Sequence, residues 1–344
     1  EPYVVRLKSL GEAGKTVIYS DPIRGKIEMP ENIMDVVLLK SDGIPTYHFA
    51  HAVDDHFMRT NLVIRGDEWL ASYPLHKQLF DLCGFALPKY AHIAPIMKLE
   101  VTVDEEGEHQ RKRKLSKRKD PEAAVGFYAE QGFPSVSVLE YLMTIANSNY
   151  EEWHAAHADK TIDDFTLSLK KMPVSGALFD MDKLASVSRD VISKMSEETL
   201  FDEISVWAKD NDEKLNAYIT ASPEKFKESI KLWKYNGKKV RKDIAKWSDL
   251  SEMFPYLYGD GVDGYEFDEK LTADERKAFL TAYISAYDHS VDSSAWFDGV
   301  KAVGEPLGFC PNIKEYKANP DAYKGSVADA CGILRVAVTG RKSS

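Results

Sequence analysis

The chain has 344 residues, of which 44% are hydrophobic and 29% are charged, a composition typical of a folded globular protein rather than a disordered one. Its 45 basic and 55 acidic side chains give a net charge of −10, which excludes a uniformly basic nucleic-acid-coating protein but allows a local basic site. No apolar run approaches the roughly 20 residues that a membrane helix needs, so we expect no membrane partner.

The first part of the chain is predicted to hold a small antiparallel β patch, over residues 1–32, and then half of a parallel α/β sheet. Beyond the patch, buried strands alternate with amphipathic helices, and Thr46 is the predicted N-cap of the first helix. The predicted strands are 35–39, 62–64 and 91–96, the helices are 46–58 and 69–83, and a small hairpin is expected at 99–103.

From about Pro121 the pattern changes to long helical segments, and no strand alternation of any length returns. We therefore predict an all-helical second half with a boundary between two subdomains near 212–222. The predicted helices are 122–131, 137–147, 161–171, 181–196, 198–211, 223–235, 238–250, 272–288 and 293–303.

The densest functional signal is a basic run at residues 111–119, where seven of the nine residues in RKRKLSKRK are basic. One interpretation is a solvated surface loop or a localisation-like signal. The other is a mobile loop in which Lys114 and Lys117 close over a polyphosphate as point charges. Such a loop would selectively stabilise a leaving pyrophosphate, because the charge on that group grows in the transition state.

The order of residues in this run carries a family resemblance. The stretch Lys114-Leu115-Ser116-Lys117-Arg118 looks like the KMSKS-type loop of class I aminoacyl-tRNA synthetases. Other stretches resemble glutamyl-tRNA synthetase in order and spacing over residues 33–145, and weaker echoes follow in the helical half. The matching stretches are 41–50, 53–58, 63–70 and 114–119, and the echoes are 179–184 and 334–340.

The resemblance implies an α/β plus all-α fold, in which the second half of a class I Rossmann-type nucleotide-binding domain precedes helical tRNA-binding domains. It divides the chain into the end of a connecting insertion (1–32), the Rossmann-type half with the KLSKR loop (33–120), a stem-contact domain (121–215) and an incomplete anticodon-binding domain (216–344). The family's HIGH-type motif is absent from the sequence. We therefore expect a fragment that begins inside the connecting insertion and is inactive alone.

The resemblance also implies which residues bind the substrates. Catalytic roles fall to Lys114, Ser116, Lys117 and Arg118. Glutamate is bound by Tyr47, His51 and Arg65. ATP is bound by Glu68, Trp69, Ile96 and Lys117. One departure is Asp120, which stands where family members often carry glycine.

Several of these positions have a structural alternative. Arg65 could form only an ion pair with Asp67 or Glu68, although a guanidinium at the end of a parallel strand also suits a substrate carboxylate. Trp69 could pack in the core at the start of its helix. Ile96 could be ordinary strand core, with only its backbone near adenine.

Two groups of histidines could imitate a metal site. They are His48 with His51 and Asp55 on one helical face, and His154 with His157 beside Glu151. Neither group has HExxH spacing, so we expect no protein-bound transition metal, and we expect Mg²⁺ to arrive with ATP as a substrate complex. The three cysteines form no CxxC pair, which favours a reducing cytoplasmic compartment.

The activity implied by the resemblance is ATP-dependent joining of L-glutamate to tRNA(Glu) by a monomer. The long helical half argues against a relative that glutamylates a modified tRNA base, and the lack of a late β pattern argues against the glutaminyl relative. A non-catalytic tRNA- or nucleic-acid-binding module is the alternative from another class. Basic residues over 223–247, with Trp233, Tyr235 and Trp247 among them, suit contacts with tRNA phosphates and bases.

Overall fold

The computed structural model describes residues 3–104, 107–258, 262 and 264–342. The chain divides into two compact units, which are Glu1–Ala129 with Pro134–Ser188, and Glu130–Phe133 with Arg189–Ser344. Within the described residues, every strand belongs to a two-stranded ladder, and helices make up most of the regular structure. No helix in these described stretches is long and apolar enough to cross a lipid bilayer.

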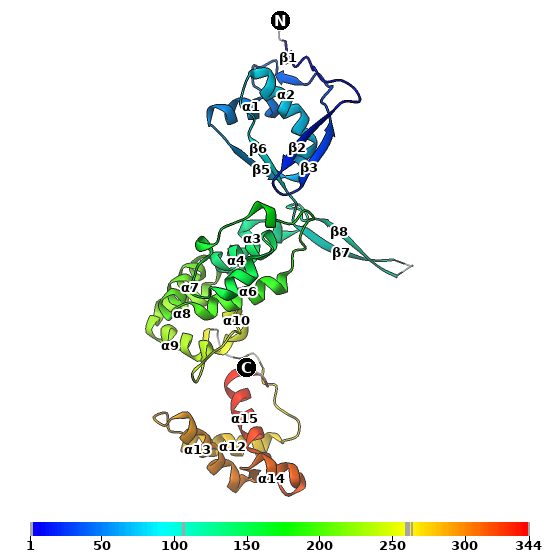
Figure 1. Cartoon of the computed structure of the whole chain (residues 1–344). Coiled ribbons are helices and arrows are strands. Elements are labelled where there is room, and N and C mark those ends of the chain that lie inside the picture. The colour runs from blue at the N-terminus through cyan, green and yellow to red at the C-terminus, as the bar shows by residue number, and fades with distance from the viewer. Residues whose placement is uncertain (1–2, 105–106, 259–261, 263, 343–344) are drawn as a thin grey trace. The chain divides into compact units, whose positions relative to one another are not determined.

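A short parallel ladder and two helices form the α/β part of the first unit (Figure 1). The apolar positions of α2 recur at one-turn spacing, with Leu75 and Leu79 buried against Ala52 of α1. Helix α2 ends at Gly84, whose φ of 68° is a left-handed conformation that favours glycine. The predicted strands at 62–64 and 91–96 and both predicted helices are present, with shifted ends. The elements are α1 (Tyr47–Phe57), β5 (Leu62–Gly66), a 3-10 turn (Asp67–Ser72), α2 (Tyr73–Cys83) and β6 (Lys89–Ile93).

The strand predicted at 35–39 is present, but its predicted place in the parallel sheet is wrong. Strand β4 (Val37–Leu39) pairs antiparallel with β1 (Val5–Arg6) and not with β5. All three of its residues are half-buried, so the apolar run covers the α1–α2 core at its edge and is not buried on both faces. Thr46 does hold the N-cap position of α1, but its hydroxyl donates to the Val37 carbonyl at 2.8 Å and accepts from no backbone N–H of the helix.

The predicted antiparallel patch is present as a hairpin of β2 (Thr16–Asp21) and β3 (Gly25–Pro30). Strand β2 lies against β6 (Figure 1). Tyr19 of β2 stacks on Tyr73 with 3.8 Å between ring centroids, and its hydroxyl lies 3.0 Å from His92 Nδ1. The hairpin thereby brings the end of β2 next to the carboxyl end of the parallel ladder, where a ligand crevice is expected in an α/β sheet.

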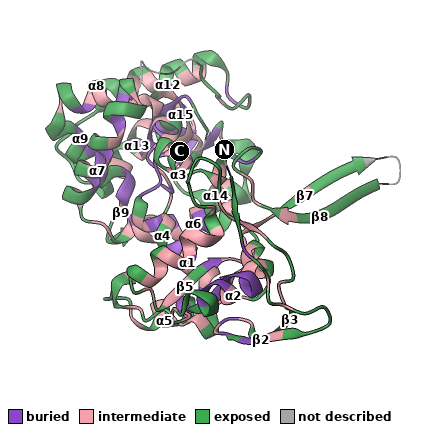
Figure 2. Cartoon of the chain, turned by 90° about the horizontal axis from the view of Figure 1, so that it is seen from above, coloured by how far each residue is buried: buried purple, intermediate pink, exposed green. Residues whose placement is uncertain are grey.

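The hairpin predicted at 99–103 is longer than expected. Strands β7 (Met97–Asp104) and β8 (Gly107–Lys114) pair antiparallel along their whole length, and they are largely exposed (Figure 2). The prediction of one basic loop at 111–119 is therefore wrong for its first four residues, which belong to β8. The hairpin register explains this, because Glu100 faces Arg111 across the ladder and attracts the guanidiniums of Arg111 and Arg113.

Helical segments of the first unit lie beside the base of this hairpin. The Met97 backbone hydrogen-bonds with Ala177 and Phe179, with N–O distances of 2.8 Å in both cases. The Phe179 ring packs edge-on against Tyr141, whose hydroxyl accepts from the Asp180 backbone N–H at 2.7 Å. The elements are α3 (Val125–Gln131), α4 (Ser135–Ala146), α5 (Tyr150–Ala156), two 3-10 turns (Ile162–Asp164, Leu169–Lys171) and α6 (Met181–Lys194). The last residues of α3, from Glu130, and of α6, from Arg189, belong to the second unit.

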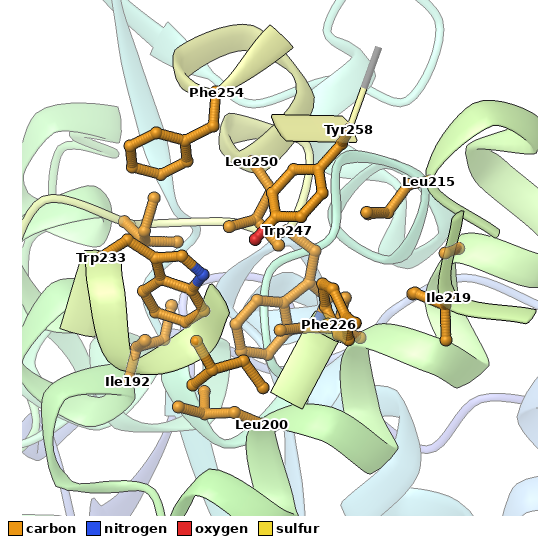
Figure 3. Close-up of a cluster of buried hydrophobic side chains, with 14 residues drawn as sticks. Ile192, Leu200, Leu215, Ile219, Phe226, Trp233, Trp247, Leu250, Phe254 and Tyr258 are labelled. Atoms are coloured by element: carbon orange, nitrogen blue, oxygen red, sulfur yellow. The ribbon is translucent and has the colours of Figure 1, made fainter. Parts of the chain in front are cut away.

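The second unit is helical, with two hydrophobic clusters. The larger one gathers side chains from α6 to α11, and Figure 3 shows Phe226, Trp233 and Trp247 pointing into it. The smaller one joins α12, α13 and α15. The helices are α7 (Glu197–Asn211), α8 (Glu213–Ala221), α9 (Pro223–Lys234), α10 (Asp249–Met253), α11 (Pro255–Tyr258), α12 (Ala273–Ala286), α13 (Ser293–Gly304), α14 (Ile313–Ala318) and α15 (Val327–Thr339). Short ladders join β9 (Tyr235–Asn236) with β10 (Lys239–Val240), and β11 (Phe309–Cys310) with β12 (Gly325–Ser326).

The interpretation of Trp233 and Trp247 as base-stacking residues is wrong, because each is only 3% exposed. Phe226, Ile230 and Trp233 follow each other at helical spacing and form the buried face of α9. Lys234 is also buried, and its ammonium donates to the Ser193 and Met195 carbonyls at the end of α6. Burial lowers the pKa of Lys234. These residues stabilise the helical core and are not accessible to a nucleic acid.

Candidate active site

Arg65 stands at the carboxyl end of β5 and is only 9% exposed. Its Nε lies 3.0 Å from His92 Nε2, its Nη1 lies 2.8 Å from His76 Nδ1, and its Nη2 donates to the Trp69 carbonyl at 3.1 Å. The guanidinium also lies over the Tyr90 ring, 4.6 Å from the centroid. Burial lowers the pKa of Arg65, while the neighbouring tyrosines act in the opposite direction.

The structural alternative for Arg65, an ion pair with Asp67 or Glu68, is wrong. Asp67 pairs with Arg24 at 2.8 Å, and Glu68 pairs with Lys114 at 3.1 Å. Among the residues that the structure describes, no carboxylate forms an ion pair with Arg65. The guanidinium is thus buried and positively charged, and its protein partners are neutral.

His92 is fully buried on β6 and links Arg65 to a buried acid. Because arginine can only donate, His92 Nε2 must accept, and the ring proton therefore lies on Nδ1. That proton points to Asp21 Oδ2 at 2.9 Å. Asp21 also accepts from the backbone N–H groups of Ile23, Arg24 and His92. Burial acts to raise the pKa of Asp21, but the hydrogen bonds with the His92 side chain and with these N–H groups lower it.

His76 is fully buried on α2 and joins Arg65 to His48. By the same reasoning its Nδ1 accepts from Arg65, so its Nε2 carries the proton and donates to His48 Nδ1 at 2.8 Å. Burial lowers the pKa of His76 to about 2, and electrostatic interactions with the His51 ring and the Arg65 guanidinium add to this effect. Burial also lowers the pKa values of His48, His51 and His92. The His76 ring is therefore neutral at physiological pH.

Acidification should destabilise the chain through His76. The folded pKa is about 2 and the ordinary value is 6.5, so between these values the unfolded chain binds a proton that the folded chain does not. Stability therefore falls as the pH falls, by about 2 kcal/mol from pH 7 to pH 5 for this one group. Urea unfolding at both pH values measures the loss. A His76→Asn variant lacks the titrating ring and should lose less; an equal loss would contradict the assignment.

The other predicted glutamate and ATP contacts surround Arg65. Tyr47 is 52% exposed, acts to raise the pKa of Arg65, and packs on Trp69 with ring centroids 4.6 Å apart. Trp69 is half-buried and supplies the carbonyl that Arg65 contacts. The His51 side chain is buried, with Nε2 2.8 Å from the Tyr90 hydroxyl and Nδ1 3.1 Å from Asp55 Oδ2. Of these three side chains, that of Tyr47 is the most exposed.

The predicted phosphate loop is a tight turn that Asp120 holds. Asp120 is 2% exposed and makes a bidentate pair with Arg113, at 2.6 and 2.7 Å. It also accepts from the Ser116 backbone N–H at 2.8 Å, and Lys98 lies 3.2 Å away. The Arg113 guanidinium holds the pKa of Asp120 well below its usual range. Lys117, Arg118 and Lys119 are exposed at the outside of this turn.

Glu68 connects the two parts of the site. Its carboxylate pairs with Lys114, the first residue of the KLSKR stretch, while its neighbour Trp69 contacts Arg65. Gly66 makes room for this carboxylate, because a Cβ at that position would lie 2.2 Å from Glu68 Oε2. Ile96 lies after the end of β6 and is not strand core; its carbonyl accepts from the Leu115 N–H at 2.9 Å. The start of the loop is thus tied to the connection between β6 and β7.

The histidines that could imitate a metal site have other partners. His48 and His51 bond to His76 and Tyr90, and His157 Nδ1 lies 2.8 Å from the Trp153 carbonyl. No group of three or more His, Cys, Asp or Glu side chains in the described part of the chain is arranged to hold a metal ion.

Four residues that shape the site were not predicted, namely Asp21, His76, His92 and Asp120. The sequence carries a weak signal for one of them. His76 lies four residues before Phe80, on the same buried face of α2, and a histidine on an apolar face needs a polar partner. Asp21 and His92 become recognisable only when distant segments meet, and the sequence shows Asp120 only as a departure from the family pattern.

The chain is similar to known proteins in sequence and in fold. Residues 1–186 match the family described as tRNA synthetases class I (E and Q), catalytic domain. The chain belongs to this family. The glutamate–tRNA ligase of Clostridium perfringens strain 13 is 45% identical over 349 residues, and that of Sorangium cellulosum is 43% identical over 352 residues. These relatives confirm the resemblance to glutamyl-tRNA synthetase.

The match to both relatives covers 100% of this class I tRNA synthetase chain and 62% of the relative, so the chain spans less than two thirds of their length. A crystal structure of a glutamate tRNA ligase from Elizabethkingia meningosepticum, in complex with its amino acid, has a similar fold. Its TM-score is 0.69 at 22% identity, with 99% of this chain and 63% of that chain covered.

Proposed function

We propose that this synthetase chain is part of a glutamate–tRNA ligase, which activates L-glutamate with ATP and transfers it to tRNA(Glu). The observation that carries the proposal is the buried Arg65 guanidinium, which has neutral partners beside a basic turn. A buried cation without a carboxylate partner is costly unless an anion binds there, and the side-chain carboxylate of glutamate supplies that anion.

In the proposed reaction, the α-carboxylate of glutamate forms a bond to the α-phosphorus of ATP, and the bond to the pyrophosphate oxygen breaks. Arg65 and Tyr47 orient the amino acid, and Glu68 and Trp69 border the nucleotide next to the Ile96 backbone. Lys117, with Lys114, Ser116 and Arg118, stabilises the leaving pyrophosphate, which departs with Mg²⁺. A terminal ribose hydroxyl of tRNA then attacks the carbonyl carbon, and AMP leaves.

We also propose that residues 121–215 contact the stem of the tRNA and that residues 216–344 bind its anticodon region. The protein is expected to work in the cytoplasm as a monomer. The alternative, a non-catalytic nucleic-acid-binding module, uses the same helical residues and needs neither Arg65 nor the KLSKR turn.

Glutamate-dependent ATP–pyrophosphate exchange tests the proposal. The complete product of the gene that encodes these residues should catalyse exchange and charge tRNA(Glu), whereas residues 1–344 alone should not, because the HIGH-type motif is absent from them. A complete product that binds tRNA but catalyses no exchange would favour the non-catalytic alternative. Robust exchange by residues 1–344 would show that the missing motif is not needed.

Residues 1–344 should still bind tRNA through phosphate contacts. Lys225, Lys238 and Lys239 are exposed cations of the helical half, and each phosphate they neutralise releases counterions. With a handful of such contacts, the association constant should fall by about 10²-fold between roughly 50 and 200 mM salt. Filter binding across a salt series measures it. Affinity that does not change with salt would contradict the tRNA-binding assignment.

A further inference from the structure

The acidic side chains nearest to Arg65, those of Asp21 and Asp55, do not contact its guanidinium directly. Asp21 is 2% exposed, and it contacts His92 and not Arg65. On the other side, Asp55 lies next to His51, which in turn bonds to the Tyr90 hydroxyl beneath the guanidinium. Each acid is thus separated from the arginine by an imidazole.

We propose that His76 and His92 are specificity-determining positioning residues that aim the Arg65 guanidinium while leaving its charge to the substrate, so that the site prefers a carboxylate to an amide. The inference rests on the proposed function, because it concerns how the same site selects glutamate. The two rings accept from different nitrogens, Nη1 and Nε, at 2.8 and 3.0 Å. With the Trp69 carbonyl on Nη2, three neutral acceptors fix the plane of the fork.

A carboxylate at either histidine position would hold the arginine equally well but would change its chemistry. An arginine–carboxylate pair is charge-assisted and neutralises the cation within the protein. A substrate carboxylate would then meet a neutral pair, and its advantage over an amide would disappear. Neutral imidazoles orient the guanidinium without this loss, which gives the histidines a role beyond packing.

The surrounding elements keep both rings in the accepting state. His76 lies between buried Leu75 and Leu79 on α2, and its second nitrogen donates to His48. The second nitrogen of His92 donates to Asp21. Because each outer nitrogen is used as a donor, each inner nitrogen is left as an acceptor facing Arg65.

Two His76 variants with side chains of the same shape separate the effect of charge from the effect of shape. In His76→Asn the amide oxygen can take the place of Nδ1, and in His76→Asp a carboxylate oxygen takes the same place. The kcat/KM values for glutamate and glutamine are measured in the complete gene product. The Asn variant should keep the preference for glutamate within about 10-fold, whereas the Asp variant should lose roughly 10²-fold or more, mainly through the KM for glutamate. The KM for ATP should be similar in both.

The pair His92→Gln and His92→Glu repeats the comparison on the other ring, with oxygen in place of Nε2, and keeps the test open if a His76 variant does not fold. An Asp or Glu variant that keeps the full preference for glutamate would overturn the inference. Equal losses in the neutral and the charged variant would do so too, because packing alone would explain them. A wild-type product that is inactive toward glutamate would instead overturn the proposed function, and the inference with it.

Discussion

Replacing Lys117 by alanine should lower the rate of glutamate activation by roughly 10²-fold or more, the size typical of losing one preorganised electrostatic contact. The KM for glutamate should change little, because Lys117 is expected to meet charge that grows on the pyrophosphate in the transition state. The structure places Lys117 at the outside of the Asp120 turn, where it is exposed. Single-turnover formation of glutamyl-adenylate by the complete gene product measures the effect.

Lys112 offers a matched control for this prediction. It is an exposed lysine of the same basic run, but it lies within β8 and opposite Leu99. Lys112→Ala removes the same charge five positions earlier and should leave the activation rate within a few-fold of wild type. If both variants lost activity equally, the general charge of the hairpin and not the position of Lys117 would be responsible. Intact activation in Lys117→Ala would refute its assignment.

Replacing Arg65 by leucine should raise the KM for glutamate by roughly 10²-fold or more and weaken discrimination against uncharged analogues. The reason is that glutamate would lose its cationic partner in the ground state and the transition state alike. Steady-state kinetics with glutamate and glutamine measure both effects. The substitution also leaves the acceptor nitrogens of His76 and His92 without a donor, so thermal unfolding must show that the variant is folded.

The variant Arg65→Lys tests whether the positive charge alone is enough for glutamate binding. It keeps a positive charge but loses the planar fork that His76, His92 and Trp69 hold in place. We expect it to retain part of the preference for glutamate over glutamine, with a KM between those of wild type and Arg65→Leu. An unchanged KM in Arg65→Leu would remove Arg65 from the glutamate site.

The elements that the sequence predicted well are those with local signals. Strands β5 and β6 are short β-rich runs, and α2 carries Leu75 and Leu79 one turn apart, so neighbouring residues suffice to identify them. The sequence of β4 is a similar short apolar run, but its pairing depends on β1, more than 30 residues away in the sequence. An apolar run indicates a strand without saying which strand pairs with it.

The residues of the site also differ in whether the local sequence is enough to predict them. Arg65 and the KLSKR stretch were found because a resemblance covers their sequence, but the neutral partners of Arg65 come from three separate elements. His76 is on α2, His92 is on β6 and the Trp69 carbonyl is in the 3-10 turn. The basic run was misjudged for a related reason. The pairing of its arginines with Glu100 depends on the hairpin register, and the pairing of Arg113 with Asp120 depends on the turn that follows, and composition reveals neither.

The buried pair of Arg113 and Asp120 constrains how sequences of this type can diverge. Exchanging Asp120 for glycine, which family members often carry there, would leave the Arg113 guanidinium and the Lys98 ammonium without their shared anion. Exchanging Arg113 alone would remove the bidentate partner of a buried carboxylate and leave it with the Lys98 ammonium at 3.2 Å. The two positions should therefore coevolve: homologues with glycine at position 120 should carry an uncharged residue at position 113, and those with aspartate should keep the arginine.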